Sequence, residues 1–235
     1  MLPCPCCGYC TLAFRQAYLT CPICLWTDDD KQPHEESEVN ESLNLVRAQV
    51  LFQKHGYIFS KMKDLGRKPT IEEARPKDWQ SLIQQANSNL RPYINQVNQA
   101  FMTVTPPEYY APPDCCEECN AANLWLSQNS LVSPNFMNTE GGDAIVSMCV
   151  AGWQYMFPHI IRLVVEPNSW KLVDALLSLH IPYMLSCYDN NRVPHTQQQR
   201  TAIEAFHQTL LAQQHIRYYE ENEWLLYNST IQIWS

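Results

Sequence analysis

Hydrophobic residues recur at helical spacing in the first half of the chain. Between residues 77 and 102 most of the apolar positions are three or four residues apart. They are Trp79, Leu82, Ile83, Ala86, Leu90, Ile94, Val97 and Phe101. This spacing predicts a helix that Pro92 kinks or divides. A shorter amphipathic helix is expected over residues 40–56, starting at an Asn or Ser cap and ending at Gly56.

The second half of the chain predicts alternating helices and strands. The apolar run at 143–157 indicates a buried helix, and residues 168–180 indicate a helix capped by Asn168 or Ser169. Shorter runs rich in β-branched and aromatic residues predict strands at 159–165 ("HIIRLVV") and 182–189 ("PYMLSCYD"). A long helix through Ala205 and three short strands should follow. The expected strands are "IRYYE", "EWLLYN" and "TIQIW".

These elements predict an α+β protein with a small N-terminal module and an α/β domain containing a mixed sheet. Paired prolines in "TVTPPEYYAPPD" favour extended backbone and mark the expected boundary. The predicted organisation is a metal module at 1–75, bridging helices at 76–104, a Pro-rich linker at 105–114 and the α/β domain at 115–235.

Composition restricts the class of partner and the compartment. The 235 residues are 46% hydrophobic, which suffices for packed cores, and acidic residues exceed basic ones by 24 to 16. A net charge of -8 argues against binding nucleic acid over a wide surface and favours a basic protein partner. No apolar run approaches the ~20 residues of a membrane span, and the first residues do not resemble a signal peptide. We therefore expect a cytoplasmic protein without a membrane partner.

Two CxxC pairs near the N-terminus carry the strongest chemical signal. Their thiolates can close a tetrahedron around one structural zinc ion. The predicted ligands are Cys4, Cys7, Cys21 and Cys24. Gly8 can take the left-handed conformation that turns backbone N–H groups toward the sulfurs, whereas Leu25 stands at the equivalent position after the second pair. The alternative is a set of reduced core thiols.

The remaining cysteines have less certain roles. Cys6 and Cys10 are not needed for a four-coordinate site; they are open to mutual pairing, a second metal position or plain burial. Cys116 and Cys119 repeat the ligand spacing next to Cys115, but no second CxxC follows them. They are expected to be ordinary thiols unless Cys6, Cys10 or a histidine completes the set in space.

The N-terminal motifs resemble a known family. "CPCCG", "CPIC", "LWTDDD" and "ESLNLVRAQVLFQKHG" are similar to the bacterial cysteine-rich CPCC family of small predicted zinc-binding domains, over roughly residues 1–75. The family's S-L-x-x-A-R helix corresponds to Ser42, Leu43, Val46 and Arg47, with Val46 in place of alanine and Cys10 as an extra cysteine. The resemblance implies an accessory protein encoded near antibacterial toxin systems, where small acidic proteins neutralise a toxin.

Two functions follow as hypotheses. The first is an immunity-type protein that occludes the active site of a cognate bacterial toxin with a basic surface. Its expected contact residues are Trp26, Asp28, Asp29, Asp30, Tyr109, Tyr110 and Trp224.

The second hypothesis is a cysteine-dependent hydrolase or transferase. Cys187 would be the nucleophile and His195 the base, near Glu166 and Asp189, at the carboxyl ends of the expected strands. The sequence lacks a glycine-rich oxyanion loop, so no catalytic residue is assigned. A third possibility, a zinc-ribbon nucleic-acid adaptor, is disfavoured by the net charge.

Overall fold

A computed structural model describes residues 1–128, 144–166, 169–189 and 195–218. The chain divides into two compact units, which are described separately. Of the described residues, unit 1 comprises 1–86 together with 215–218, and unit 2 comprises those between 87 and 214. The division falls within the segment expected to bridge two domains.

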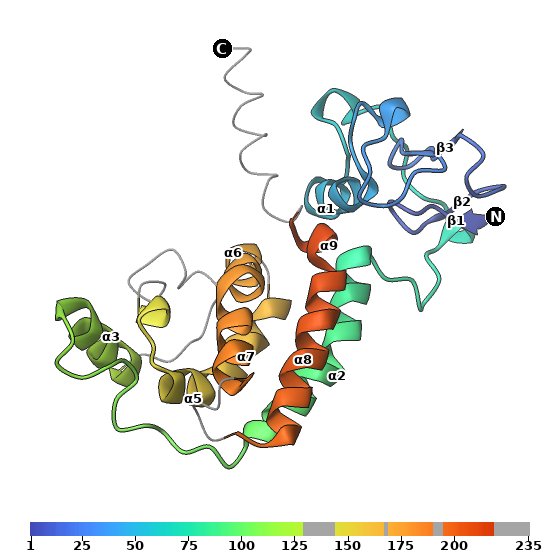
Figure 1. Ribbon diagram of the computed structural model, residues 1–235. Helices are drawn as coiled ribbons and strands as arrows, with labels where there is room; N and C mark the ends of the chain where they lie inside the picture. The colour runs from blue at the N-terminus through green and yellow to red at the C-terminus, as the bar shows by residue number, and fades with distance from the viewer. Residues whose placement is uncertain (129–143, 167–168, 190–194, 219–235) are drawn as a thin grey trace, which may run out of the picture. The chain divides into compact units, whose positions relative to one another are not determined.

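Unit 1 begins with two small antiparallel sheets, in the blue part of Figure 1. Strand β1 (Leu2–Pro3) pairs with β2 (Cys10–Leu12), and β3 (Leu19–Thr20) pairs with β4 (Thr27–Asp28). Strands of two or three residues bury too little surface to be stable alone. Other interactions must therefore hold this part of the unit, and the cysteine-rich turns are the obvious source.

The rest of unit 1 consists of helices and loops packed against these sheets. After the 3-10 turn η1 (Glu38–Asn40), helix α1 (Leu45–His55) is capped by Asn44, whose side chain accepts a hydrogen bond from the Arg47 amide at 3.0 Å. It ends at Gly56 as the sequence predicts. The short turns η2 (Ser60–Met62) and η3 (Ile71–Glu73) follow. Buried Gln49 ties α1 to two other segments, because it donates to the Pro5 carbonyl at 2.7 Å and accepts from the Leu82 amide at 2.8 Å.

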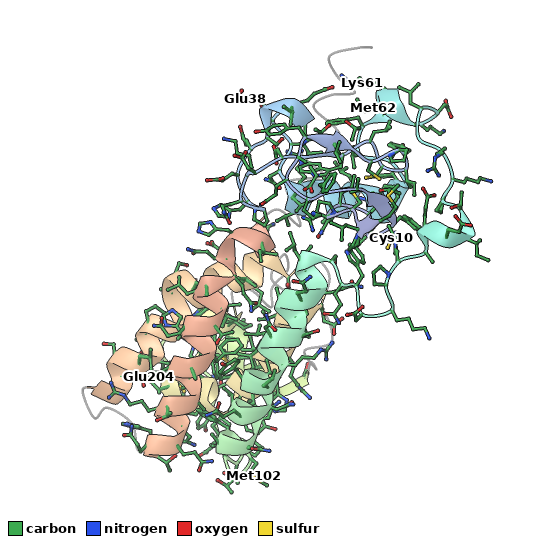
Figure 2. The ribbon with its side chains drawn as sticks, turned by 90° about the vertical axis from the view of Figure 1, so that its right-hand side faces the viewer. Cys10, Glu38, Lys61, Met62, Met102 and Glu204 are labelled. Atoms are coloured by element: carbon green, nitrogen blue, oxygen red, sulfur yellow. The ribbon has the colours of Figure 1, made fainter. Side chains whose placement is uncertain are left out.

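The elements of secondary structure in the described part of unit 2 are all helices or helical turns, joined by irregular segments such as residues 102–116. Helix α2 (Leu82–Phe101) contains Pro92, as expected, and α3 (Glu117–Gln128), α5 (Val150–Ile161) and α8 (Gln197–Ala212) are its other long helices. Helix α9 (Gln214–Tyr218) comes after α8 and belongs to unit 1 from residue 215 onward. Figures 1 and 2 show α2 and α8 side by side, and the sticks of Figure 2 show side chains between them. The core there includes Leu90, Val97, Ile203, Phe206 and Leu210.

The strands expected at 159–165 and 182–189 are helices in the structure. Helix α5 runs to Ile161 and continues as the 3-10 turn η5 (Arg162–Val165). The second run forms α7 (Ile181–Asp189), preceded by α6 (Trp170–Ala175) and by the π-helical turn η6 (Leu176–His180). The prediction of an α/β domain with a mixed sheet is therefore wrong for the described part of unit 2.

The reason lies in which apolar positions are buried. Phe157, Ile160, Ile161 and Val164 are fully buried and follow the three-and-four spacing of one helical face, while Arg162 is exposed. The β-branched residues that favoured a strand thus pack as a helix in the core. Of the three later strands, "IRYYE" begins within α9, and "EWLLYN" and "TIQIW" lie outside the described residues.

Candidate metal centre and aromatic loop

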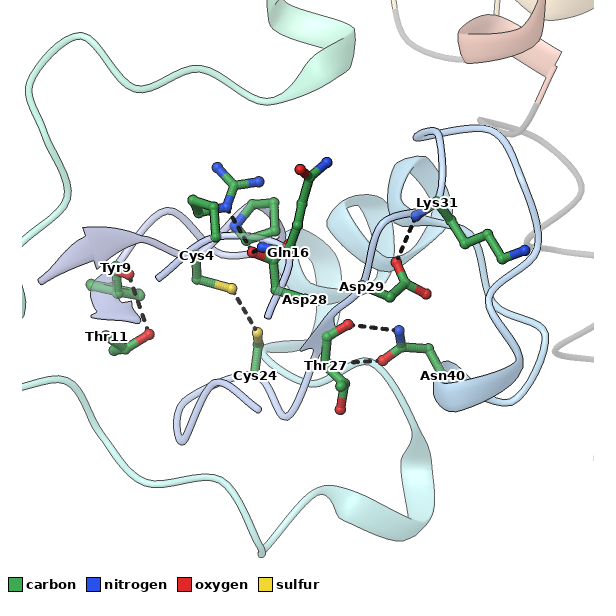
Figure 3. A network of polar contacts seen from close by, with 12 residues as sticks. Cys4, Tyr9, Thr11, Gln16, Cys24, Thr27, Asp28, Asp29, Lys31 and Asn40 are labelled. Carbon is green, nitrogen blue, oxygen red and sulfur yellow. Dashed lines mark hydrogen bonds and ion pairs between the residues drawn. The ribbon is translucent and has the colours of Figure 1, made fainter. Parts of the chain in front are cut away.

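The four predicted metal ligands converge in unit 1. Their sulfur atoms all lie within 4.8 Å of one another, and all four residues are buried. The Sγ atoms of Cys4 and Cys24 are 3.6 Å apart (Figure 3), and those of Cys7 and Cys21 are 3.7 Å apart. A disulfide would require about 2.05 Å. A tetrahedral ion with bonds of about 2.3 Å, the Zn–S length, would place its sulfurs about 3.8 Å apart, so the four thiols fit such an ion.

The two CxxC turns have the same backbone hydrogen bonds. The Gly8 amide donates to the Cys4 carbonyl and the Leu25 amide donates to the Cys21 carbonyl, both at 2.9 Å. Both residues are left-handed, with φ of 80° at Gly8 and 64° at Leu25. Leu25 therefore adopts the left-handed conformation that a glycine usually takes, at a conformational cost of about 1–2 kcal/mol. The sequence departure at this position does not change the geometry of the turn.

Hydrogen bonds around the sulfurs divide the four thiols into two kinds. Hydrogen bonds donated by Cys24, Cys4 and Cys7, and by the Thr11 hydroxyl 3.1 Å away, lower the pKa of Cys21. Hydrogen bonding to Cys21 raises the pKa of Cys4 and Cys7, and burial raises that of Cys24. Four thiolates cannot share this buried volume without a cation to neutralise them. The donor set is therefore suited to a thiophilic metal ion.

The loop between β2 and β3, residues 13–18, is held by a buried carboxylate. Asp28 is 3% exposed and accepts from Arg15 Nε at 2.7 Å and from the Gln16 amide at 2.8 Å (Figure 3). The Asp28 carbonyl also accepts from the Tyr18 amide at 2.9 Å. Gln16 and Tyr18 have φ of 55° and 57°, a strained conformation for residues other than glycine.

This loop displays two aromatic side chains to solvent. Phe14 is 68% exposed and Tyr18 is 56% exposed. The Tyr18 hydroxyl donates to Asp30 at 3.1 Å, and that contact raises the pKa of Tyr18. We call residues 13–18 the aromatic loop. Hydrophobicity patterns did not single it out, and its only sequence signal is two aromatic residues between two metal-binding pairs.

A small cavity of about 130 Å³ lies beside the aromatic loop. Its lining mixes both signs of charge, from Arg15 and Lys31 and from Asp29 and Glu35. Ligand-binding pockets usually measure about 300–1,000 Å³. This cavity is therefore too small for a typical metabolite.

The residues predicted to contact a partner occupy different environments. Trp26 is 2% exposed and packs in the core of unit 1. Asp29 is 7% exposed and accepts hydrogen bonds from Ser37 and from the Lys31 amide (Figure 3). Together with Asp28, these two residues have structural partners inside unit 1. Asp30 is exposed.

The other predicted contacts belong to unit 2 or lie beyond the described residues. Tyr109 is 46% exposed, whereas Tyr110 is half-buried with its ring 6.1 Å from that of Tyr155. The amides of Tyr110 and Ala111 both donate to the Asn123 side chain, so this part of the Pro-rich segment is fixed to α3. Trp224 lies outside the described residues.

The residues of the enzyme hypothesis do not come together at a strand end. Cys187 lies within helix α7 and is 2% exposed. His195 directly precedes Thr196, the N-cap of α8. Glu166 follows η5, and Asp189 is the last residue of α7. The strands that motivated this constellation are helices, so its structural basis was wrong.

A second group of thiols gathers in unit 2. The sulfur atoms of Cys115, Cys116 and Cys119 lie within 4.8 Å of one another at the start of α3. Cys115 and Cys116 are exposed and Cys119 is buried. The sequence predicted that Cys116 and Cys119 are ordinary thiols unless Cys6, Cys10 or a histidine completes the set, whereas the third sulfur in the structure comes from the adjacent Cys115. Cys6 is buried in unit 1, and Cys10 lies on β2.

Comparison with known proteins identifies the N-terminal part only. The family model described as "Cysteine-rich CPCC" matches residues 2–73, which include the four converging cysteines and α1. No curated protein and no solved structure matches the chain. Among the described residues, no helix is long and apolar enough to cross a membrane. Residues 2–73 of this chain thus form a cysteine-rich CPCC segment.

Proposed function

We propose that this chain is a binding protein in which a structural zinc ion supports a surface for a protein partner. The partner is a cognate bacterial toxin with a basic surface, which the chain neutralises by occluding its active site as an immunity protein does. The observation that carries the proposal is the aromatic loop: a rigid, strained loop beside the metal centre that exposes Phe14 and Tyr18.

Zinc is the metal that best suits the four cysteines. A closed set of four thiolates leaves no coordination position for a substrate or an activated water, so the ion has a structural role. The short strands β1 to β4 flank the two CxxC turns, and metal ligation supplies stability that such strands lack. Elemental analysis of the purified chain should find zinc in this site.

The aromatic loop has the features of a preorganised protein-binding surface. Aromatic side chains are enriched among the residues that dominate binding energy. Three hydrogen bonds to Asp28 fix the loop before a partner arrives, which reduces the ordering cost of association. The net charge of -8 and the exposed Asp30 favour a basic partner through faster association.

The enzyme alternative receives less support. The thiol of Cys187 is enclosed in the core of unit 2, and a nucleophile must reach its substrate. The small cavity beside the aromatic loop also suits no typical metabolite. We therefore place function on the surface of unit 1.

Co-expression with a candidate toxin, sought in the reading frames next to the one that encodes this chain, tests the proposal. The double variant Phe14→Ala/Tyr18→Ala should weaken toxin binding by at least tenfold and abolish growth rescue, while zinc content and thermal stability stay unchanged. The matched control is Ile71→Ala, which removes another exposed hydrophobic side chain of unit 1, 92% exposed, and should rescue fully. Rescue by the double variant at wild-type level would refute the role of the loop, and absence of any bound toxin would refute the immunity function.

A further inference from the structure

The thiol cluster of unit 2 is the second place in the described chain where sulfur atoms converge as metal ligands do. We propose that Cys115, Cys116 and Cys119 bind a second thiophilic metal ion through three thiolates, with one position open to solvent. This site is independent of the CPCC segment, which ends at residue 73. It is also independent of the proposed toxin binding, which concerns unit 1.

Local backbone structure brings the three sulfurs together. Cys115 and Cys116 precede α3, and Cys119 lies in its first turn. The Asn120 amide donates to the Cys116 carbonyl at 3.2 Å, so the helical hydrogen-bond pattern already includes Cys116. Asp114, with φ of 56°, makes a left-handed turn just before the pair. One turn and one helix start therefore place three thiols within 4.8 Å of one another.

The surroundings of the cluster favour a cation. Asp114, Glu117 and Glu118 flank the cysteines along the chain, so the cluster lies in an acidic stretch. The basic groups that would instead stabilise a free thiolate are absent from residues 108–123.

Exposure distinguishes this cluster from the centre in unit 1. The four cysteines there are buried and complete a tetrahedron, whereas Cys115 and Cys116 face solvent and no fourth group joins the three sulfurs among the described residues. Three thiolates satisfy the trigonal coordination of Cu⁺, and they hold Zn²⁺ with a water or carboxylate as fourth ligand. Both are soft or borderline d¹⁰ ions, and the site should exchange its metal faster than the buried centre.

Metal titration of the full chain tests this inference. The reduced, metal-free protein is first loaded with one equivalent of Zn²⁺, which fills the four-cysteine centre. Further Zn²⁺, or Cu⁺ under anaerobic conditions, is then added against a competing chelator, and bound metal is counted by native mass spectrometry and by thiolate-to-metal absorption. We expect wild-type protein to take up a second equivalent of at least one ion and Cys116→Ser to take up none.

Two further variants make the result specific. Cys119→Ser should also lose the second equivalent. Cys149→Ser should retain it, because Cys149 is the N-cap of α5, lies outside the cluster, and is replaced by a good capping residue. Uptake of Zn²⁺ alone would indicate a four-coordinate ion with a solvent ligand, and uptake of Cu⁺ alone would indicate trigonal coordination. Either result supports the site. Equal uptake by Cys116→Ser and wild-type protein for both ions would overturn it.

Discussion

Replacing Gly8 by alanine tests whether the first CxxC turn depends on close packing as well as on conformation. Gly8 and Gly56 have the same φ of +80°, so an alanine at either position incurs a similar left-handed cost of about 1–2 kcal/mol. The two sites differ in space. A Cβ on Gly8 would lie 2.5 Å, 2.7 Å and 2.9 Å from three ring atoms of Trp79, whereas a Cβ on Gly56 would have no neighbour within 4 Å.

The expected difference in stability between the two variants follows from the contacts that Trp79 loses. To admit the methyl group, the half-buried indole must move away from the CxxC turn and from Arg75, whose guanidinium lies 5.3 Å from the ring centre. Losing that stacking costs about 0.5–1 kcal/mol, and lost burial adds a similar amount. Gly8→Ala should therefore destabilise unit 1 by about 2–4 kcal/mol in total, and Gly56→Ala by the left-handed cost alone.

Denaturant-induced zinc release, followed with a chromogenic chelator, reports on unit 1 specifically. Because the ligands Cys4 and Cys7 lie on the altered turn, Gly8→Ala should also weaken zinc binding about 5- to 30-fold, and Gly56→Ala should leave it unchanged. The same loss of stability in both variants would refute the packing argument. An unchanged zinc affinity in Gly8→Ala would refute the link between the turn and the metal.

Three other predictions concern the second CxxC turn, the metal and a buried histidine. Cys21→Ser should release one metal equivalent per chain and raise amide hydrogen exchange in residues 1–60 far more than in unit 2; unchanged metal content would contradict the four-cysteine centre. Leu25→Gly should leave unit 1 at least as stable as wild type in zinc-release experiments, since it relieves left-handed strain, whereas a loss above about 1 kcal/mol would show that Leu25 packing dominates. Burial lowers the pKa of His180 in the folded protein to about 4. As the pH falls below about 6.5, the imidazole is therefore protonated in the unfolded chain before it is protonated in the folded protein. The contribution of neutral His180 to the free energy of unfolding should be fully present above about pH 6.5 and should fall by up to about 3 kcal/mol between pH 6.5 and pH 4. His180→Phe keeps a ring beside Trp153 and should reduce that decline in denaturation curves. An identical pH dependence in the variant and the wild type would contradict the assignment.

The convergence of the four cysteines was predictable because it depends on short sequence motifs rather than on how distant segments pack. A CxxC pair fixes the turn geometry within four residues, and two such pairs suffice to identify Cys4, Cys7, Cys21 and Cys24 from their spacing alone. The conformation of Leu25 was not predictable from residue preference, because leucine rarely adopts a positive φ. The geometry of the CxxC turn overrides the preference of that residue.

The helical unit was harder to predict, because short apolar runs are ambiguous between buried strands and buried helices. The run "HIIRLVV" is rich in β-branched residues, yet its burial follows the helical pattern set by Phe157. Flanking helices supply the apolar environment that decides the outcome, and that environment is a tertiary property. The same limitation explains Trp26 and Asp28, whose burial depends on how distant segments fold over them.

The candidate metal centre and the aromatic loop are linked through strands β3 and β4, although the metal would not contact the partner in the proposed complex. Cys21 directly follows β3, and β4, which ends at Asp28, pairs with β3 through Leu19 and Thr20. Asp28 in turn holds the Arg15 side chain and the Gln16 amide. Loss of the ion would free the β3–β4 pair, release Asp28 and let the strained loop relax. We therefore expect the proposed binding surface to form only in the metal-loaded protein, so that a structural ion would be required for binding without contacting the partner.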